Sequence, residues 1–95
     1  MKFVMIGWDG PEGQAKQKVL RPAHRERLKQ LESKGKFILA GPFEDRSGSL
    51  IVIEADSAQE ARAIVQMDPY VEQGVFGKVE IRPFIQVFPA DEVKP

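Results

Sequence analysis

Ninety-five residues suffice for one domain, and 42% hydrophobic with 29% charged residues is the composition of a folded globular chain rather than a disordered one. The 14 basic and 14 acidic side chains balance to zero net charge, which disfavours nucleic-acid binding because phosphate neutralisation requires a basic excess. The absence of cysteine excludes disulfides, thiolate nucleophiles and thiolate metal ligands.

The first half of the chain predicts a strand, a helix and a second strand. Residues 3–8 are an apolar run that ends at a glycine–proline turn, so we expect a buried strand there. Residues 12–18 are polar and could begin a helix. A firmer helix is predicted from Pro22, because proline is tolerated in the first turn of a helix and not in its interior, and Gly35 closes this helix. The apolar run at residues 37–40 predicts the second strand.

The second half predicts a strand, a helix and a long final strand. Residues 49–55 contain a continuous apolar stretch, typical of a strand covered on both faces. Ser57 and Glu60 form a capping box that opens the second helix. Residues 75–88 predict the final strand, in which Pro83 requires an edge position or a bulge. Alternation along this strand places Val79 and Ile81 on one face and Phe76, Lys78, Glu80 and Arg82 on the other.

The element order βαββαβ predicts the ferredoxin-like α+β fold, a four-stranded antiparallel sheet with the helices on one face. The other face of such a sheet is uncovered, so we expect two copies to pack as a homodimeric α/β barrel. Residues 1–95 then form one domain with a core at about 2–88 and a mobile polar tail at 89–95. The apolar runs are too short for a signal peptide or a membrane span, so we expect a cytoplasmic location and no membrane partner.

His24 is the only histidine, and an acid–base histidine needs a partner that fixes its tautomer. If Pro22 begins the helix, His24 lies in the first turn, where free backbone amides disfavour the imidazolium. The structural alternative is a core histidine, since Leu20, His24 and Leu28 share one line along the helix.

Asp68 is the candidate partner, because it lies where the second helix ends and precedes Pro69-Tyr70. Aspartate before proline is also ordinary turn chemistry, and Tyr70 could bond a substrate oxygen or merely pack. Ser49 could face a pocket or simply turn a hairpin. One histidine with scattered acids makes a poor metal site, and no nucleotide motif is present, so we expect neither a metal nor a cofactor.

Taken together, these strings resemble the YCII-related domain family. The match runs from Phe3 to Phe88 and pairs Pro-Ala-His with Asp-Pro-Tyr at a specific separation. The matching residues are Arg21-Pro22-Ala23-His24, Gly35, Ala40-Gly41-Pro42, Gly48-Ser49, Glu54-Ala55, Glu60-Ala61, Asp68-Pro69-Tyr70-Val71, Gly74 and Val79-Glu80-Ile81-Arg82-Pro83-Phe84.

The resemblance implies a dimeric ferredoxin-like fold and a His–Asp site, carried here onto His24 and Asp68. One branch of the family dehydrochlorinates chlorinated hydroxyhydroquinones, which implies a lyase of aromatic degradation. The loop at residues 43–49 is shorter than in longer members, and we expect it to line the mouth of the pocket. The expected substrate-binding residues are Arg21, Pro42, Ser49 and Tyr70.

The sequence therefore predicts a cofactor-independent enzyme that moves protons on a small oxygenated aromatic ring or quinol. His24 would act as base and then as acid, with Asp68 stabilising the transient imidazolium. One alternative is a non-catalytic module that binds a small metabolite, or assists another enzyme of the pathway, through the same pocket. Another is a structural dimer in which the two residues are a buried capping pair.

Overall fold

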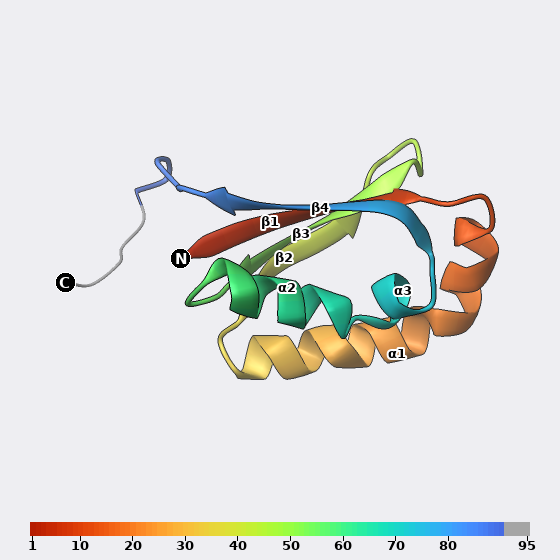
Figure 1. Ribbon diagram of the computed structural model, residues 1–95, viewed down its shortest axis with the longest axis horizontal. Helices are drawn as coiled ribbons and strands as arrows, with labels where there is room; N and C mark the ends of the chain where they lie inside the picture. Colours follow the sequence, from red (N-terminus) through yellow and green to blue (C-terminus); the bar gives the residue numbers. More distant parts are fainter. Residues whose placement is uncertain (91–95) are drawn as a thin grey trace.

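The computed structural model describes residues 1–90, which form a four-stranded antiparallel sheet with its helices packed against one face (Figure 1). Neighbouring strands pair in the order β2-β3-β1-β4. This arrangement confirms the predicted ferredoxin-like α+β fold. The elements are β1 (Lys2–Asp9), α1 (Gly13–Ser33), β2 (Phe37–Pro42), β3 (Gly48–Glu54), α2 (Ala58–Gln66), α3 (Pro69–Glu72) and β4 (Phe76–Phe84).

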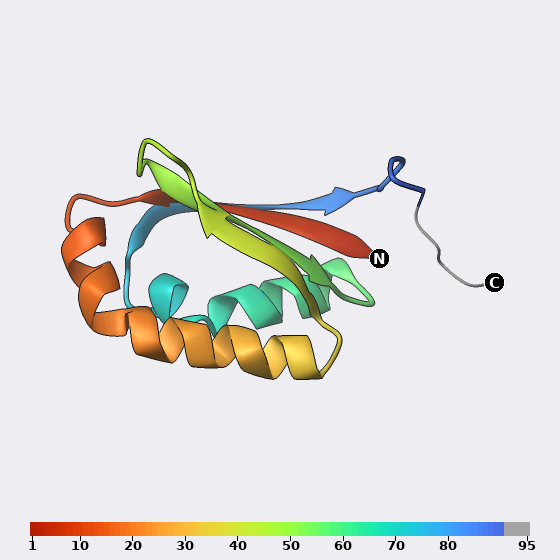
Figure 2. The same cartoon turned by 180° about the vertical axis from the view of Figure 1, so that it is seen from behind.

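The core lies between the sheet and the helices, because every second residue of the two central strands faces the helical layer. Phe3 and Met5 of β1 stand opposite Ile53 and Ile51 of β3 in the register, and all are buried. Figure 2 shows from behind that the other face of the sheet has no helix against it. The continuous apolar run of β3 is therefore fully covered on one face only, and Leu50, on the other face, is half-buried.

The helix α1 begins at Gly13, within the residues 12–18 that could begin a helix. The firmer prediction of a start at Pro22 is wrong, because Pro22 lies in the interior of α1. Proline removes one hydrogen bond from a helix and bends it, and the N-terminal turns of α1 stand at an angle to the rest (Figure 1). The position is tolerated because Pro22 is exposed. His24 therefore lies in mid-helix, and the expectation that it meets first-turn amides is also wrong. Gly35 ends the helix as predicted, with a positive φ of 70°.

The final strand is an edge strand, as Pro83 requires, because β4 pairs with β1 alone among residues 1–90. It ends at Phe84 rather than at Phe88. Beyond it, Ile85, Val87 and Phe88 are exposed. Of the tail expected at 89–95, residues 91–95 lie outside the described part of the chain.

The predicted assignment of side chains to the two faces of the final strand is correct in the middle of β4 and wrong at its start. Val79 and Ile81 pack against the core as expected. Phe76, expected on the opposite face, is buried in the core instead. A register shift between Trp8 and Asp9 of β1 interrupts the pairing at this point, so the simple alternation does not extend to Phe76.

The predicted capping box at the start of α2 is confirmed on one side. Ser57 Oγ accepts a hydrogen bond from the Glu60 backbone N–H at 3.1 Å. The Glu60 carboxylate does not return to Ser57. It accepts from the Asp56 backbone N–H at 2.7 Å and from Lys36 Nζ at 3.2 Å. This end of α2 is thereby joined to the chain just before β2.

Candidate active site

Asp68 lies in the tight connection between α2 and α3 and is the N-cap of α3. Its Oδ1 accepts a hydrogen bond from the Tyr70 backbone N–H at 2.8 Å, and Pro69 occupies the first helical position, which proline favours. The predicted turn after α2 is thus one short helix. With only 4% of its surface exposed, Asp68 is a buried carboxylate in a fixed orientation.

His24 reaches this carboxylate from α1. The His24 Nδ1 atom lies 2.9 Å from Asp68 Oδ1, so the two predicted catalytic residues lie in direct contact. An ionised carboxylate only accepts hydrogen bonds, so Nδ1 carries the proton in this contact. The lone pair of Nε2 is then free to accept a proton from a bound molecule.

Tyr70 holds the plane of the histidine ring. The two rings are stacked with their centroids 3.8 Å apart and their planes within 5°. Phe76 packs edge-on against Tyr70, with the ring centroids 6.1 Å apart and the planes at 82°. Gly7 of β1 lies against Phe76, so close that a Cβ atom there would come within 2.6 Å of the phenylalanine ring. A column of packed rings therefore runs from β1 to His24 and fixes the orientation that the Asp68 contact requires.

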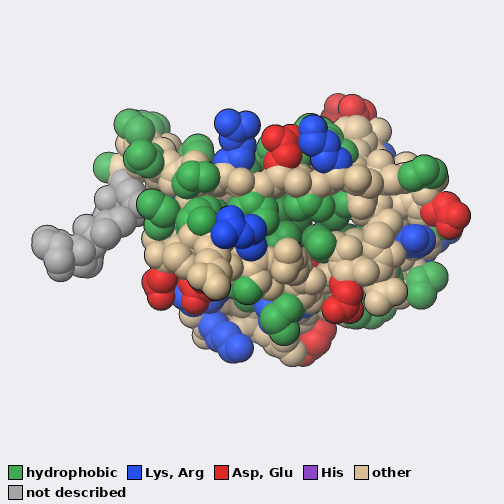
Figure 3. All heavy atoms as spheres, in the orientation of Figure 1, with side chains coloured by type: hydrophobic (Ala, Val, Ile, Leu, Met, Phe, Trp, Pro, Cys, Tyr) green, Lys and Arg blue, Asp and Glu red, His purple; other side chains and the backbone are tan. Residues whose placement is uncertain are grey.

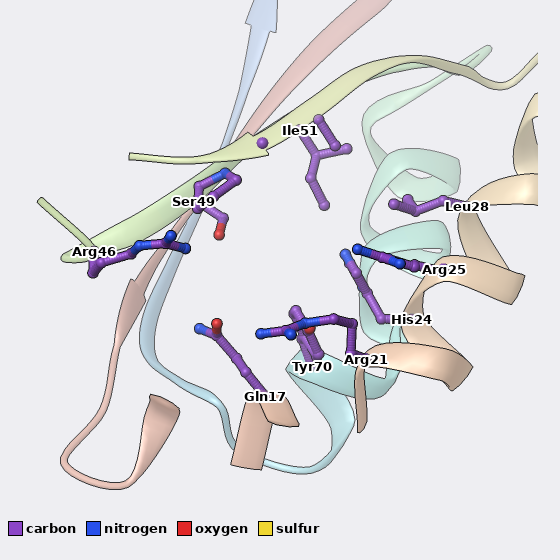
Figure 4. A pocket seen from close by; sticks show the side chains of 12 residues that line it. Gln17, Arg21, His24, Arg25, Leu28, Arg46, Ser49, Ile51 and Tyr70 are labelled. Atoms are coloured by element: carbon purple, nitrogen blue, oxygen red, sulfur yellow. The ribbon is translucent and has the colours of Figure 1, made fainter. Parts of the chain in front are cut away.

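A cavity of about 460 Å³ opens in front of His24, between α1 and the strands β2 and β3 (Figure 4). His24 lines this cavity, whereas Asp68 stands behind it and is not part of the wall. The predicted substrate-binding residues all line the wall, so the structure brings the whole predicted set together. They are Arg21, Pro42, Ser49 and Tyr70.

The sequence did not single out several other residues of the wall. Gln17 recurs with His24 at helical spacing, and a helix extended back to Gly13 would have revealed it. Leu28 was placed on one line with His24, but as a core position and not as part of a cavity wall. Arg46 comes from the turn between β2 and β3, where no periodicity exists, although the loop itself was expected at the pocket mouth. Arg25 also lines the wall.

The wall of the cavity is positively charged. As formed by residues 1–90, this wall contains the guanidinium groups of Arg21, Arg25 and Arg46 and no carboxylate. An adjoining cavity of about 210 Å³ shares Arg21 and Arg46 and contains Asp9 at its wall. Burial raises the pKa of the Asp9 carboxyl above its usual value, and the hydrogen bond from Gln17 Nε2, at 3.0 Å, partly opposes this.

The described part of the chain contains neither a cluster that could hold a metal ion nor a helix that could span a membrane. Among residues 1–90, no group of three or more His, Asp or Glu side chains lies close enough together to hold a metal ion. In the same residues, no helix combines the length and the apolar character needed to cross a bilayer.

Fold and site together define a small ferredoxin-like α+β protein with a histidine–carboxylate pair at the wall of a cavity. The YCII-related domain matches residues 1–85, and the chain belongs to this family, as the sequence resemblance predicts. Protein YciI of Escherichia coli O6:H1 is 33% identical over 98 residues, which cover 93% of this chain and 100% of that protein. An uncharacterised protein of Haemophilus influenzae matches with the same identity and coverage.

One solved structure adds a chemical activity to the comparison. It is 5-chloro-2-hydroxyhydroquinone dehydrochlorinase (TftG) from Burkholderia phenoliruptrix AC1100, in complex with 2,5-dihydroxybenzoquinone. The similarity has a TM-score of 0.76 and 25% sequence identity, over 90% of this chain and 94% of TftG.

Proposed function

We propose that this protein is a cofactor-independent acid–base enzyme, of the dehydrochlorinase or lyase type, that acts on a small oxygenated aromatic ring or quinol. The observation that carries the proposal is the contact of 2.9 Å between His24 Nδ1 and Asp68 Oδ1 behind a cavity wall. A buried carboxylate that holds a histidine in this way orients it and stabilises its protonated form. The similarity to TftG supports the substrate class.

The chemistry needs only proton transfers. His24 Nε2 removes a proton from a ring hydroxyl, and the resulting imidazolium returns it to the ring carbon that bears chlorine. A second hydroxyl then loses its proton as chloride leaves with the electrons of its bond to carbon. The products are a quinone and HCl, so no external oxidant is required. Each proton transfer by a positioned group contributes roughly 10²–10⁴-fold to the rate.

The assembly is part of the same proposal. The sheet face without helices carries half-buried apolar residues, which a second copy of the chain would cover in a homodimeric α/β barrel. The ligand is a small molecule, and the protein acts in the cytoplasm.

The proposal is tested by incubating the purified protein anaerobically with a panel of chlorinated and unchlorinated hydroxyhydroquinones, beside the His24→Ala variant. We expect quinone absorbance and released chloride with at least one chlorinated compound, and neither with the variant, whose circular dichroism stays unchanged. Absence of turnover across the panel, together with a rise in melting temperature on ligand addition, would support a non-catalytic binding module instead.

A further inference from the structure

Arg21 and Arg46 stand at the junction of the two cavities, because they line both of them. Arg21 extends from α1 and Arg46 from the turn between β2 and β3, so the two side chains approach the same space from opposite walls (Figure 4). Ser49 and Gln17 border this space. A molecule bound in front of His24 therefore extends towards two guanidinium groups.

Within residues 1–90, these guanidinium groups have no partner. Over residues 1–90, the side chains of Arg21, Arg25 and Arg46 take part in no ion pair and no hydrogen bond with another residue. The chain has zero net charge, yet the wall of the main cavity contains these three cations and no acid. Unpaired guanidinium groups gathered on the wall of a cavity favour a bound anion.

The acid nearest to the junction restricts where that anion lies. Asp9 is on the wall of the smaller cavity, and Gln17 Nε2 holds its carboxylate at 3.0 and 3.2 Å. A carboxylate there repels a second negative group. The anion is therefore held at the junction and in the main cavity, between the arginines and His24.

We infer that the ligand of this site is a planar organic anion, whose ionised oxygen is held by Arg21 and Arg46 while its ring lies against His24. This inference rests on the proposed function and specifies the form of its ligand: an aromatic or quinoid compound that the site holds with a ring oxygen ionised, as it is once His24 has taken the proton of a ring hydroxyl. Arginine suits the task because its planar fork binds the oxygens of carboxylates and ionised enols in two-point contacts.

An anionic substrate also fits the proposed reaction. Removing a proton from a ring hydroxyl raises the electron density on the ring carbons, which then accept a proton more readily. Fixed cations at Arg21 and Arg46 stabilise the ionised oxygen without taking part in the proton transfer. Arg46 is thus assigned as a specificity-determining residue.

The test is isothermal titration calorimetry of the full chain with two matched probes. The first is 2,5-dihydroxybenzoquinone, which is ionised at neutral pH, and the second is 2,5-dimethoxybenzoquinone, which has no acidic hydroxyl. We expect the ionised probe to bind at least roughly tenfold more tightly, and the Arg46→Gln variant to lose at least roughly tenfold of that affinity. The control Arg62→Gln, an exposed arginine of α2 outside both cavities, is expected to bind as the wild type does.

Two results would overturn the inference: equal affinity for both probes, or an Arg46→Gln variant that binds the ionised probe as well as the wild type. Inorganic phosphate that competes as strongly as the ionised probe would also overturn it, because the site would then take any small anion. Binding is measured without turnover, so the two proposals fail separately. Anion-selective binding without turnover would contradict only the proposed enzymatic function. Turnover with unchanged KM and kcat in Arg46→Gln contradicts only the anion site.

Discussion

At the scale of single residues, one carboxylate oxygen performs two tasks. Asp68 Oδ1 caps α3 through the Tyr70 N–H and at the same time contacts His24 Nδ1. The cap fixes the carboxylate, and the carboxylate fixes the histidine. The cap and the histidine contact therefore occur together, and the structural alternative, a dimer in which His24 and Asp68 are only a buried capping pair, is separated from catalysis by variants of Asp68.

The Asp68→Asn variant separates the two tasks. Asparagine keeps an oxygen that can cap α3 but has no charge to stabilise an imidazolium. We expect kcat to fall by roughly 10²–10⁴-fold, with little change in KM or in melting temperature. Steady-state kinetics and thermal melting measure both. The double variant that combines Asp68→Asn with His24→Ala is expected to have a kcat no lower than that of His24→Ala alone. Full activity of Asp68→Asn would exclude the pair as the catalytic unit.

The sequence was sufficient to predict this pair and part of the cavity wall, but not the whole wall. His24 and Asp68 stand in short, distinctive strings, and Arg21, Pro42, Ser49 and Tyr70 lie in or beside those strings or at strand ends. Arg25 and Arg46 carry no such signal. Whether an exposed arginine lines a cavity depends on how α1 and the β2–β3 turn approach each other, which is a property of tertiary packing.

At the scale of elements, Glu60 connects the start of α2 with Lys36 before β2. The backbone N–H of Asp56 and then the Lys36 ammonium hold the pKa of the Glu60 carboxyl below its ordinary value of 4.5. A carboxyl with a lowered pKa in the folded state contributes stability above its ordinary pKa. This contribution is lost as the pH falls through the lowered value.

The Glu60→Gln variant should therefore melt at a lower temperature than the wild type at neutral pH. The difference should shrink as the pH falls through the lowered pKa of the Glu60 carboxyl and disappear once the wild-type carboxyl is also protonated. Thermal melting across this range measures it, with Glu26→Gln on the exposed surface of α1 as the control. A difference that stays constant over the whole range would contradict the role of the Glu60 charge.

A second feature at this scale is the column of rings that begins at Gly7 of β1. Gly7→Ala would place a methyl group 2.6 Å from the Phe76 ring, and Phe76 supports the tyrosine that stacks on His24. We expect a loss of about 1–3 kcal/mol of stability, together with a lower kcat. The melting temperature of Gly41→Ala, where a Cβ meets nothing within 4 Å, is the control for stability. An unchanged melting temperature for Gly7→Ala would contradict the column.

The boundaries of helices and strands could be predicted where a local sequence signal ends the element. They could not be predicted where tertiary packing determines the boundary. Gly35 and Ser57 mark ends that the structure retains. The continuity of α1 through Pro22 was not predicted because an interior proline is unfavourable in isolation, yet Pro22 is exposed and the helix is held by its contacts with α3 and β2. The inward position of Phe76 depends on the register shift in β1, which no periodicity in β4 reveals.

At the scale of the whole molecule, a row of half-buried apolar side chains lies on the sheet face that has no helix against it. Val4, Ile6, Leu50 and Val52 alternate with core residues, so they face away from the helices and are only half-buried. Hydrophobic side chains also gather at the end of β4, where Phe84 is 47% exposed (Figure 3). These surfaces are the basis for the homodimer that we propose.

Ile6→Lys tests the dimer. In the register Ile6 lies between Leu50 and Glu80, so a lysine there is tolerated beside Glu80 in a monomer but places charge inside a face-to-face interface. Light scattering after gel filtration should give a dimer for the wild type and a folded monomer for the variant. Val19→Lys on α1, where Val19 is 78% exposed, should remain a dimer. A monomeric wild type, or a dimeric Ile6→Lys, would contradict the proposed interface.

The central claim is that His24, held by Asp68, moves protons on a ring. The most direct measurement is the exchange of ring hydrogens of unchlorinated hydroxyhydroquinone in D₂O, followed anaerobically by proton NMR. Exchange needs no leaving group and reports protonation of a ring carbon by itself. We expect the ring hydrogens to exchange faster than in buffer when the wild-type protein is present, and at the buffer rate with His24→Ala. Exchange at the buffer rate with the wild type, while the compound is bound, would contradict it.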